Sequence, residues 1–296
     1  MLNALSIDVE DGWSIFSHDC LSKSIEPTET VVRDTERILD IMANKSVKAT
    51  FFVLGNVAEK FPSLIKRIAS AGHEIGTHGF AHRQIFQLAP EEFRMEVRKA
   101  KSILEELVSV DVVGHRAPAF SVAPGTKWAL KILAEEGFTY DSSIVPCKNL
   151  RYGWDGFNKG VCRVDLGDGL SIVEVPMSIL PIPMTRKGLL TGGGYLRHFP
   201  YFVSYAAIKH IQKTRPVIVY MHPYEFGDEV VPLPTEHLSA ASRCRVRWRL
   251  LKVTRNRHTM PAKIRKLLSA FEFSTVKRVI DDSDRDRKTA SISITG

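Results

Sequence analysis

Residues 72–82 read GHEIGTHGFAH and place a short apolar segment between a glycine stop and a pair of histidines. The segment HEIGT (73–77) follows a helical pattern that ends at Gly72, and its length and composition predict a strand. His78 and His82 come directly after it and lie four residues apart, so both imidazoles can face one point. The stretch therefore predicts an α/β fold with a metal site at a strand end. The alternative is two solvated or core histidines that share this spacing by coincidence.

Short apolar runs alternate with helical patterns along the first 225 residues. The patterns predict strands over residues 4–9, 47–55, 73–77, 110–118, 138–143, 170–180 and 215–223. They predict helices over residues 30–45, 57–72, 89–110, 124–137 and 200–213. This alternation is typical of β/α units around a mostly parallel sheet. About seven units are too many for a small doubly wound sheet and one short of an eightfold barrel, so we expect an irregular (β/α) barrel of about seven strands.

The composition limits the class of protein. A chain of 296 residues that is 44% apolar and 25% charged can bury a sizeable core and is unlike a disordered protein. The opening residues carry no secretory leader pattern, and no long apolar run follows, so we expect a cytoplasmic protein. The four cysteines lie far apart, which suggests neither a cysteine zinc site nor a disulfide framework.

Positive charge is concentrated near the C-terminus. No acidic residue lies between Glu236 and Glu272, and the basic residues there are Arg243, Arg245, Arg247, Arg249, Lys252, Arg255, Arg257, Lys263, Arg265 and Lys266. We expect peripheral contact with an anionic membrane surface, at the inner membrane face, or with a lipid-diphosphate-linked glycan, since each charge is worth ~1 kcal/mol near such a surface. Nucleic acid is the rival partner, but no nucleic-acid-binding motif accompanies the charges, so we expect none. A solvated basic face is the plain alternative.

These patterns divide the chain into three parts. The barrel is expected over residues 1–228, and a short basic C-terminal extension packed on the barrel over residues 229–280. The polar residues 281–296 predict a disordered tail.

Carboxylates cluster at the end of the first predicted strand. SIDVEDG (6–12) contains Asp8, Glu10 and Asp11, and the first two project to the same side of an extended chain because they are two residues apart. One could bind a metal ion while the other accepts a proton. A catalytic zinc site commonly needs a third protein ligand beside two imidazoles, and a carboxylate here supplies it. Solvated loop acids or a helix cap are the alternatives.

Two more candidate residues lie just past apolar runs. They are Arg116 in GHRAPAF (114–120) and His222 in YMHPYEF (220–226). In an α/β barrel, the loops at the carboxyl ends of the strands build the active site. The alternatives are a surface ion pair for Arg116 and a core position for His222. Charged or titratable groups occur at four predicted strand ends, however, and core packing alone does not explain so many of them.

The ordered segments SIDVED, GHEIGTHGFAH, RAPAF, YDSS and MHPYEF resemble the polysaccharide deacetylases, carbohydrate esterase family 4, over roughly residues 3–226. DVEDGW, FTYDSSIVP and GGGYLRHFPY are similar to a subgroup encoded with bacterial exopolysaccharide assembly systems. The resemblance implies an irregular (β/α) barrel that hydrolyses N-acetyl groups on sugars. It also implies roles for individual residues: metal ligands His78 and His82, general base Asp8, an orienting Arg116 and general acid His222.

One departure from the family pattern leaves the third metal ligand open. Many members have two adjacent aspartates in the first strand, whereas this chain reads Asp-Val-Glu-Asp. The metal carboxylate is Glu10 by the same-side argument, which we prefer, or Asp11 by residue type. We expect one divalent ion, with Zn as the first choice and Co, Ni or Mn as alternatives.

The predicted function is that of a metal-dependent hydrolase that removes N-acetyl groups from an amino sugar in a polysaccharide or a lipid-linked glycan precursor. Substrate contacts are expected from Trp13, Pro118, Tyr195 and Tyr224. An inactive barrel that only binds glycan, and a metal amidohydrolase that acts on a small non-sugar amide, are the alternative functions.

Overall fold

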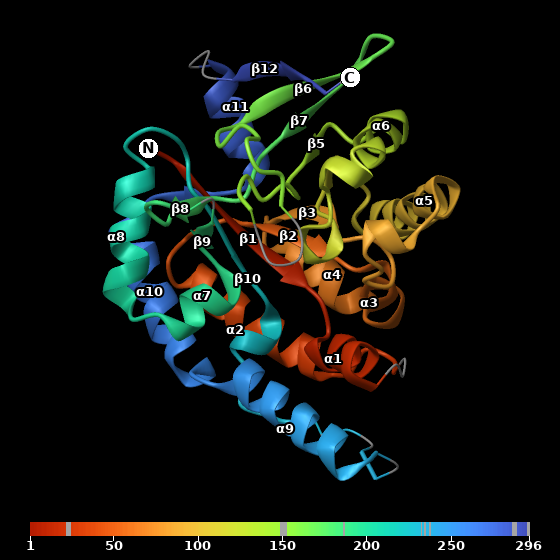
Figure 1. Cartoon of the computed structure of the whole chain (residues 1–296), viewed down its shortest axis with the longest axis vertical. Coiled ribbons are helices and arrows are strands. Elements are labelled where there is room, and N and C mark those ends of the chain that lie inside the picture. The colour runs from red at the N-terminus through yellow and green to blue at the C-terminus, as the bar shows by residue number, and fades with distance from the viewer. Residues whose placement is uncertain are drawn as a thin grey trace.

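The first strand, β1 (Asn3–Val9), lies at the centre of the molecule, and each of its residues is buried. It pairs in parallel with β10 (Ile218–Met221) on one side and with β2 (Thr50–Val53) on the other. Because both faces of such a strand are covered, its sequence is largely apolar. The computed structural model in Figure 1 describes residues 1–21, 25–148, 153–185, 187–231, 233, 235–236, 238–285 and 289–294.

Parallel strands follow one another across the sheet in the order β10, β1, β2, β3, β4, β5 and β7. The bounds of the last four are β3 (Glu74–Thr77), β4 (Gly114–His115), β5 (Tyr140–Asp141) and β7 (Leu170–Glu174). Each neighbouring pair in this order is parallel. The arrangement confirms the predicted α/β class with a sheet of parallel strands.

The barrel is irregular on the side between β7 and β10. In the part of the chain that the structure describes, no backbone ladder joins these two strands. Side chains from the segments that follow β7 contact β10 instead: the N–H of Ile218 donates to Ser178 Oγ over 2.9 Å, and Thr191 Oγ1 donates to the Ile218 carbonyl over 2.7 Å. The strand predicted over residues 170–180 is interrupted here, because Pro176 has no N–H to donate to a ladder.

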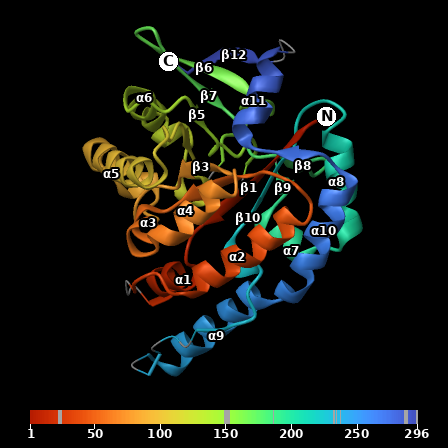
Figure 2. The ribbon, with the colours of Figure 1, turned by 180° about the vertical axis from the view of Figure 1, so that it is seen from behind.

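Helices pack on the outside of the strands, as Figures 1 and 2 show. Their bounds are α2 (Thr30–Ala43), α3 (Gly55–Lys60), α4 (Pro62–Ser70), α5 (Pro90–Val108), α6 (Trp128–Glu135) and α8 (Tyr201–Ile211). The start of α5 is capped, since Glu92 Oε2 accepts from the N–H of Ala89 over 2.8 Å. The helix predicted over residues 57–72 is two helices, because Pro62 begins a new helix and cannot continue the preceding one.

Some elements have no counterpart in the sequence prediction. They are α1 (Gly12–Leu21), α7 (Gly193–His198), β6 (Cys162–Gly167) and the hairpin β8 (Ile179–Pro181) with β9 (Gly188–Leu190). β6 pairs antiparallel with β7. The turn between them uses Gly167, Asp168 and Gly169, all with positive φ, a conformation that glycine adopts easily.

Helices also follow the barrel in the basic C-terminal part. They are α9 (Ala240–Thr254), α10 (Met260–Ala270) and α11 (Val276–Arg285), and the short strand β11 (Phe273–Ser274) pairs with β1. Met260 and Ile264 of α10 lie in the same hydrophobic cluster as Leu5 and Ile7 of β1. α10 therefore shares the core of the barrel.

The prediction of a disordered tail over residues 281–296 is wrong for its described residues. α11 continues to Arg285, and β12 (Ala290–Ser293) pairs in parallel with β6. Strand pairing uses backbone N–H and C=O groups that polar sequences also have, so composition alone was a poor guide. Residues 286–288 and 295–296 lie outside the described residues.

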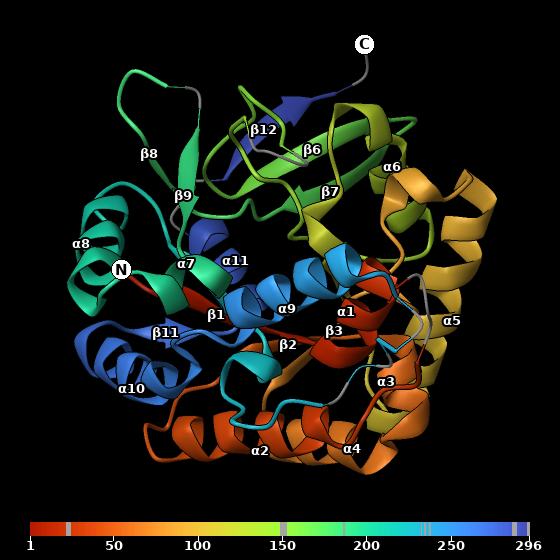
Figure 3. The same ribbon diagram turned by 60° about the horizontal axis from the view of Figure 1, so that its bottom comes forward.

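α9 lies across the end of the barrel at which β1 stops, as Figure 3 shows. Val246 of α9, Phe16 of α1 and Leu233 form a small hydrophobic cluster there. Among the described residues, no helix has both the length and the apolar character needed to cross a membrane.

Candidate active site

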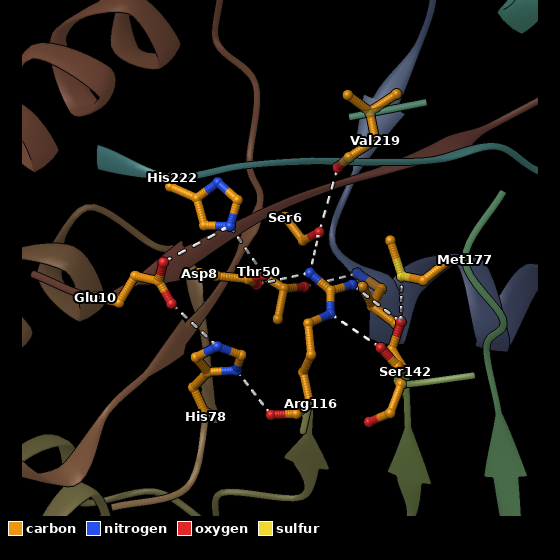
Figure 4. Close-up of polar contacts among 12 residues, drawn as sticks. Ser6, Asp8, Glu10, Thr50, His78, Arg116, Ser142, Met177, Val219 and His222 are labelled. Atoms are coloured by element: carbon orange, nitrogen blue, oxygen red, sulfur yellow. Dashed lines mark hydrogen bonds and ion pairs between the residues drawn. The ribbon is translucent and has the colours of Figure 1, made fainter. Parts of the chain in front are cut away.

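The predicted site residues meet at the carboxyl ends of the parallel strands. Asp8 lies in β1 and Glu10 follows it, while His78 follows β3, Arg116 follows β4 and His222 follows β10. Parallel strands end at the same edge of the sheet, which brings together residues that are far apart in sequence. Figure 4 shows Glu10, His78 and His222 turned toward one another, with Arg116 beside Asp8.

Glu10, His78 and His82 form a group that can hold a metal ion. Glu10 Oε2 lies 3.4 Å from His78 Nε2 and 3.1 Å from His82 Nε2. The three residues offer ligand atoms that all lie within 4.8 Å of one another. Two imidazoles and one carboxylate are the protein ligands of a common type of catalytic zinc site. The donor set therefore fits the ion that the sequence predicts.

A backbone contact determines which nitrogen of His78 faces Glu10. His78 Nδ1 lies 2.8 Å from the carbonyl oxygen of Arg116. A carbonyl oxygen only accepts hydrogen bonds, so Nδ1 carries a proton and donates it, and Nε2 is the nitrogen that faces Glu10. Histidine ligands of metals are commonly oriented by such a contact.

Asp11 makes a different set of contacts and lies apart from this group. Asp11 Oδ1 accepts from the N–H of Ser14 over 2.6 Å. Asp11 Oδ2 accepts from the N–H and the hydroxyl of Thr28 over 3.0 and 2.6 Å, and from the hydroxyl of Thr30 over 3.1 Å. Both oxygens are thus used to tie the start of α1 to the start of α2 and the segment before it. The geometry favours Glu10 over Asp11 as the metal carboxylate.

The Glu10 carboxylate is anionic although it is buried. Burial raises the pKa of a carboxyl group, because the charged form loses its hydration. Here the attraction of His82 and His222, with hydrogen bonds from His78 and His82, outweighs burial and holds the pKa of Glu10 well below its usual value. A buried anion between imidazole nitrogens is an attractive position for a cation.

Arg116 holds Asp8 from one side. The guanidinium is fully buried, and its Nη1 donates to Asp8 Oδ1 over 2.8 Å and to Ser6 Oγ over 2.7 Å. Nε and Nη2 donate to the carbonyl and the hydroxyl of Ser142, both over 3.0 Å. Because one oxygen of Asp8 is fixed, the other is aimed at His222, with Asp8 Oδ2 and His222 Nε2 4.0 Å apart.

His222 is held by Glu225, a residue that the sequence analysis did not single out. Glu225 Oε2 lies 3.2 Å from His222 Nδ1, and Glu225 Oε1 accepts from Arg197 Nη1 over 3.0 Å. Glu225 and Arg197 are both buried. Burial lowers the pKa of His222, but Glu10 and Glu225 outweigh it and raise this pKa to about 9. His222 is therefore protonated at neutral pH, and its Nε2–H faces Asp8 and Glu10.

The sequence contained one signal for Glu225. An acidic residue lies three positions after His222 in MHPYEF, within reach of the same ring in a tight turn, and the 3₁₀ turn Pro223–Glu225 provides this geometry. Arg197 gave no such signal, because it comes from α7, distant in sequence.

The four expected substrate contacts lie in different environments. Trp13 exposes 2% of its surface and Pro118 is also buried, as Asp8 and His78 are, so substrate contacts from Trp13 and Pro118 stay predictions. Trp13 packs inside the fold, as apolar rings of this size commonly do. Tyr195 and Tyr224 are partly exposed, and the Tyr224 ring stacks on His222 with a centroid distance of 5.1 Å. Contacts from these two tyrosines stay predictions.

A cleft of about 550 Å³ adjoins the metal group. His82 lines this cleft together with residues of α1 and α3, which contribute polar side chains that include His18, Asn56 and Lys60. A cleft of this volume is in the range that binds ligands of moderate size.

Two family models match successive parts of the chain. Residues 19–140 match the model described as Polysaccharide deacetylase, and residues 142–281 match one described as Domain of unknown function (DUF3473). These findings support the polysaccharide deacetylase family. The second match runs across residue 228, so the predicted boundary between barrel and extension stays a prediction.

Several curated relatives carry the names of carbohydrate deacetylases. A Peptidoglycan-N-acetylglucosamine deacetylase of Bacillus cereus is 40% identical over 96 residues, which cover 32% of this chain and 35% of that protein. A Peptidoglycan deacetylase-like protein of Gibberella zeae is 30% identical over 196 residues, 63% of this chain and 54% of that protein. A Chitooligosaccharide deacetylase of Azorhizobium caulinodans is 31% identical over 99 residues, 33% of this chain and 45% of that protein. The chain spans about a third to a half of the length of these relatives.

Solved structures show the same fold. A Mycobacterium smegmatis protein assigned to the polysaccharide deacetylases has a TM-score of 0.64 at 20% identity, covering 100% of this chain and 93% of that chain. A Pseudomonas aeruginosa protein with the same assignment has a TM-score of 0.62 at 15% identity, covering 97% of this chain and 92% of that chain. A carbohydrate esterase family 4 pseudoenzyme of Bacillus anthracis has a TM-score of 0.50 at 15% identity, covering 99% of this chain and 69% of that chain. The predicted irregular (β/α) barrel is confirmed, and these likenesses show the fold alone.

Proposed function

We propose that this chain is a metal-dependent hydrolase that removes the N-acetyl group from an amino sugar in a polysaccharide or a lipid-linked glycan precursor. One observation carries the proposal: a Glu10, His78 and His82 group lies opposite a carboxylate and a protonated imidazole, Asp8 and His222. The names of the curated relatives support a carbohydrate substrate.

The metal ion proposed is Zn²⁺, with Co, Ni and Mn as alternatives. Glu10, His78 and His82 would hold it, and when bound it supplies positive charge that polarises the acetyl carbonyl and makes water more acidic. The orientation of His78, with Nδ1 toward a carbonyl oxygen and Nε2 toward Glu10, and the anionic Glu10 suit such binding.

Asp8 serves as the general base in this proposal. Its Oδ1 is occupied by Arg116, so Oδ2 is the oxygen that accepts the proton of the attacking water. The Arg116 charge and its contacts with Ser6 and Ser142 keep Asp8 in one orientation. Arg116 thus positions the base and does not itself exchange a proton.

His222 serves as the general acid. The water oxygen adds to the acetyl carbon, the C–N bond breaks, and the proton on His222 Nε2 passes to the departing sugar nitrogen, so that the products are acetate and a free amine. Glu10 and Glu225 keep His222 protonated before this step. Each proton-transfer group contributes about 10²- to 10⁴-fold to the rate.

We further propose that sugars flanking the reacting residue lie in the cleft next to His82. Its volume of about 550 Å³ and its mixed lining of polar and apolar side chains suit one or two sugar rings beyond the reacting one. Oligosaccharide substrates should then have a higher kcat/KM than the free N-acetyl monosaccharide. A chain that serves exopolysaccharide assembly would meet such substrates.

Acetate release from a panel of free, oligomeric, polymeric and lipid-linked N-acetyl sugars tests the function, with small non-sugar amides in parallel. We expect release from at least one sugar class by the wild-type protein and a large loss with His222→Ala. Glycan binding without acetate release from any substrate would indicate an inactive barrel, for which the Bacillus anthracis pseudoenzyme is a precedent in this fold. Release from the small amides alone would indicate an amidohydrolase.

A further inference from the structure

The outward face of α9 is an unusual surface. Val246 packs inward against Phe16 and Leu233. The side chains on the opposite face recur at helical spacing and are exposed: Cys244, Arg247, Trp248, Leu251 and Arg255. We call these five residues the α9 face.

Two large apolar side chains stand out on the α9 face. Trp248 exposes 57% of its surface and Leu251 exposes 62%. They lie three residues apart, which places them side by side on a helix. Lys252 Nζ lies 4.3 Å from the centre of the Trp248 ring, so a cation sits beside the exposed indole. An apolar pair rimmed by cations differs from the single exposed apolar residues that are common on surfaces.

The charges of α9 itself are of one sign. No acidic residue occurs between Glu236 and Glu272. Within the described part of the chain, no carboxylate forms an ion pair with the basic residues on and beside the α9 face, which are Arg243, Arg245, Arg247, Lys252 and Arg255. Unpaired cations on one helix attract an anionic surface and are released from it by salt.

The α9 face also has a defined position relative to the active site. α9 crosses the end of the barrel at which β1 stops, the end that carries the site (Figure 3). The carbonyl oxygen of Lys252 lies 3.4 Å from Arg197 Nη2, and Arg197 binds Glu225, the partner of His222. A flat surface that covers the α9 face therefore lies at the same end of the fold as the site.

We propose that the α9 face binds the headgroup region of an anionic lipid bilayer, with Trp248 and Leu251 inserted between headgroups and the arginines paired with lipid phosphates. A helix with Trp and Leu on one face and basic residues around them is the type that lies in this interface. Phosphate binding alone would need the cations and leave the exposed Leu251 unexplained. The proposal does not depend on the catalytic activity, because membrane binding is measured without turnover.

Co-sedimentation with vesicles tests the proposal on the full chain. The vesicles contain phosphatidylcholine with about 30% phosphatidylglycerol, or phosphatidylcholine alone, at low ionic strength. We expect the wild-type protein to sediment with the anionic vesicles only, and to be released by high salt. The fluorescence of the wild-type protein should shift to shorter wavelength on binding, and a Trp248→Phe variant should lose most of this shift.

Two sets of variants separate the apolar and the charged contributions. Arg247→Gln with Arg255→Gln should weaken binding to anionic vesicles by about 20- to 30-fold, which corresponds to the usual effect of two charges near a charged surface. Trp248→Ser with Leu251→Ser should weaken it by at least about 10-fold. Because all four side chains are exposed, the thermal unfolding temperatures should stay close to that of the wild-type protein.

Matched control variants lie on α8. Phe202 exposes 68% of its surface there, and Lys209 and Lys213 are exposed on the same helix and the turn that follows it. Phe202→Ser and the pair Lys209→Gln with Lys213→Gln should leave vesicle binding unchanged. Failure of the wild-type protein to sediment with anionic vesicles, or equal losses for the α8 and α9 variants, would overturn the proposal. Retained vesicle binding with altered acetate release from soluble oligosaccharides in the α9 variants would also overturn it, and would make the α9 face a glycan surface.

Discussion

Asp8 and Glu10 are two residues apart, so their side chains leave β1 on the same side and meet different partners there. Asp8 is held by Arg116, and Glu10 lies between the two imidazoles. The residue between them points the other way, as the alternation of an extended chain requires. This spacing puts a proton acceptor and a metal ligand next to each other.

Asp8→Asn should reduce acetate release by about 10²- to 10⁴-fold, since the variant cannot accept the proton of water. Glu10, His78 and His82 are unchanged, so the bound metal should stay close to the wild-type amount. Arg116 is fully buried and loses its anionic partner, and removing one member of a buried pair costs up to about 3–5 kcal/mol of unfolding free energy. Steady-state kinetics, metal analysis and chemical denaturation check the three outcomes.

Asp40→Asn is the matched control, because Asp40 is exposed on α2. It should leave turnover, metal content and stability at wild-type values. Turnover of Asp8→Asn within a few-fold of wild type would remove Asp8 from the role of base.

Glu225→Gln should move the basic limb of the pH profile of kcat/KM to lower pH. The general acid must be protonated, so activity falls as pH rises through the pKa of His222, which Glu10 and Glu225 raise to about 9. Without the Glu225 charge the pKa of His222 is lower, so kcat/KM begins to fall at a lower pH. A merely structural role for Glu225 would reduce activity at all pH values and leave the limb in place.

Glu225→Asp and Glu229→Gln are the controls for this measurement. Glu225→Asp keeps the negative charge, so its basic limb should lie closer to the wild-type pH than the limb of Glu225→Gln does. Glu229 pairs with Arg33 on the surface and is separate from His222, so its variant should have the wild-type limb.

The sequence predicted some of these residues and not others, for a physical reason. The candidates that the sequence proposed all follow apolar strand segments, and a parallel fold places strand ends together. The partners of Asp11, which are Thr28 and Thr30, and the Arg197 contact of Glu225 depend on how loops and helices pack. No local pattern reports such contacts.

At the scale of elements, α7 depends on a close approach to β10. A Cβ atom at Gly192 would overlap the carbonyl oxygen of Tyr220, whereas a Cβ at Gly194 would be 3.8 Å from its nearest neighbour. Gly192 therefore has no room for a side chain, whereas Gly194 has room for one.

Gly192→Ala should therefore lower the free energy of unfolding by about 1–3 kcal/mol or more, because an inserted methyl group forces the backbone to shift. Gly194→Ala is the matched control on the same segment and should be neutral or slightly stabilising, since alanine favours the helical state. Thermal and chemical denaturation compare the two variants. Equal effects on stability would contradict the packing that we describe.

The elements that sequence patterns missed share one property: contacts from distant segments stabilise them. α1 does not separate its apolar and polar residues onto two faces, and Phe16 finds its partners in α9 and at Leu233. β12 is polar and pairs with β6 through its backbone. The helices α2 and α5, by contrast, carry a clear apolar periodicity of their own, and they form close to the predicted residues.

At the scale of the whole molecule, the barrel edge, the cleft and α9 lie at one end of the fold. The sequence predicted the barrel and the basic segment separately. It could not place the basic helix over the site, because that arrangement depends on Val246, Phe16 and Leu233, which are far apart in the chain. The cleft that we propose for flanking sugars, the α9 face that we propose for a lipid surface and the active site therefore lie at the same end of the molecule.

The metal content of purified protein, measured together with acetate release, tests the central claim most directly. We predict about one divalent ion per chain, loss of both ion and activity on treatment with a chelator, and recovery of both when Zn²⁺ is added. Glu10→Ala and His78→Ala should each lower metal affinity by at least about 10-fold. Full acetate release by metal-free protein, or wild-type metal binding by the Glu10→Ala and His78→Ala variants, would contradict the account.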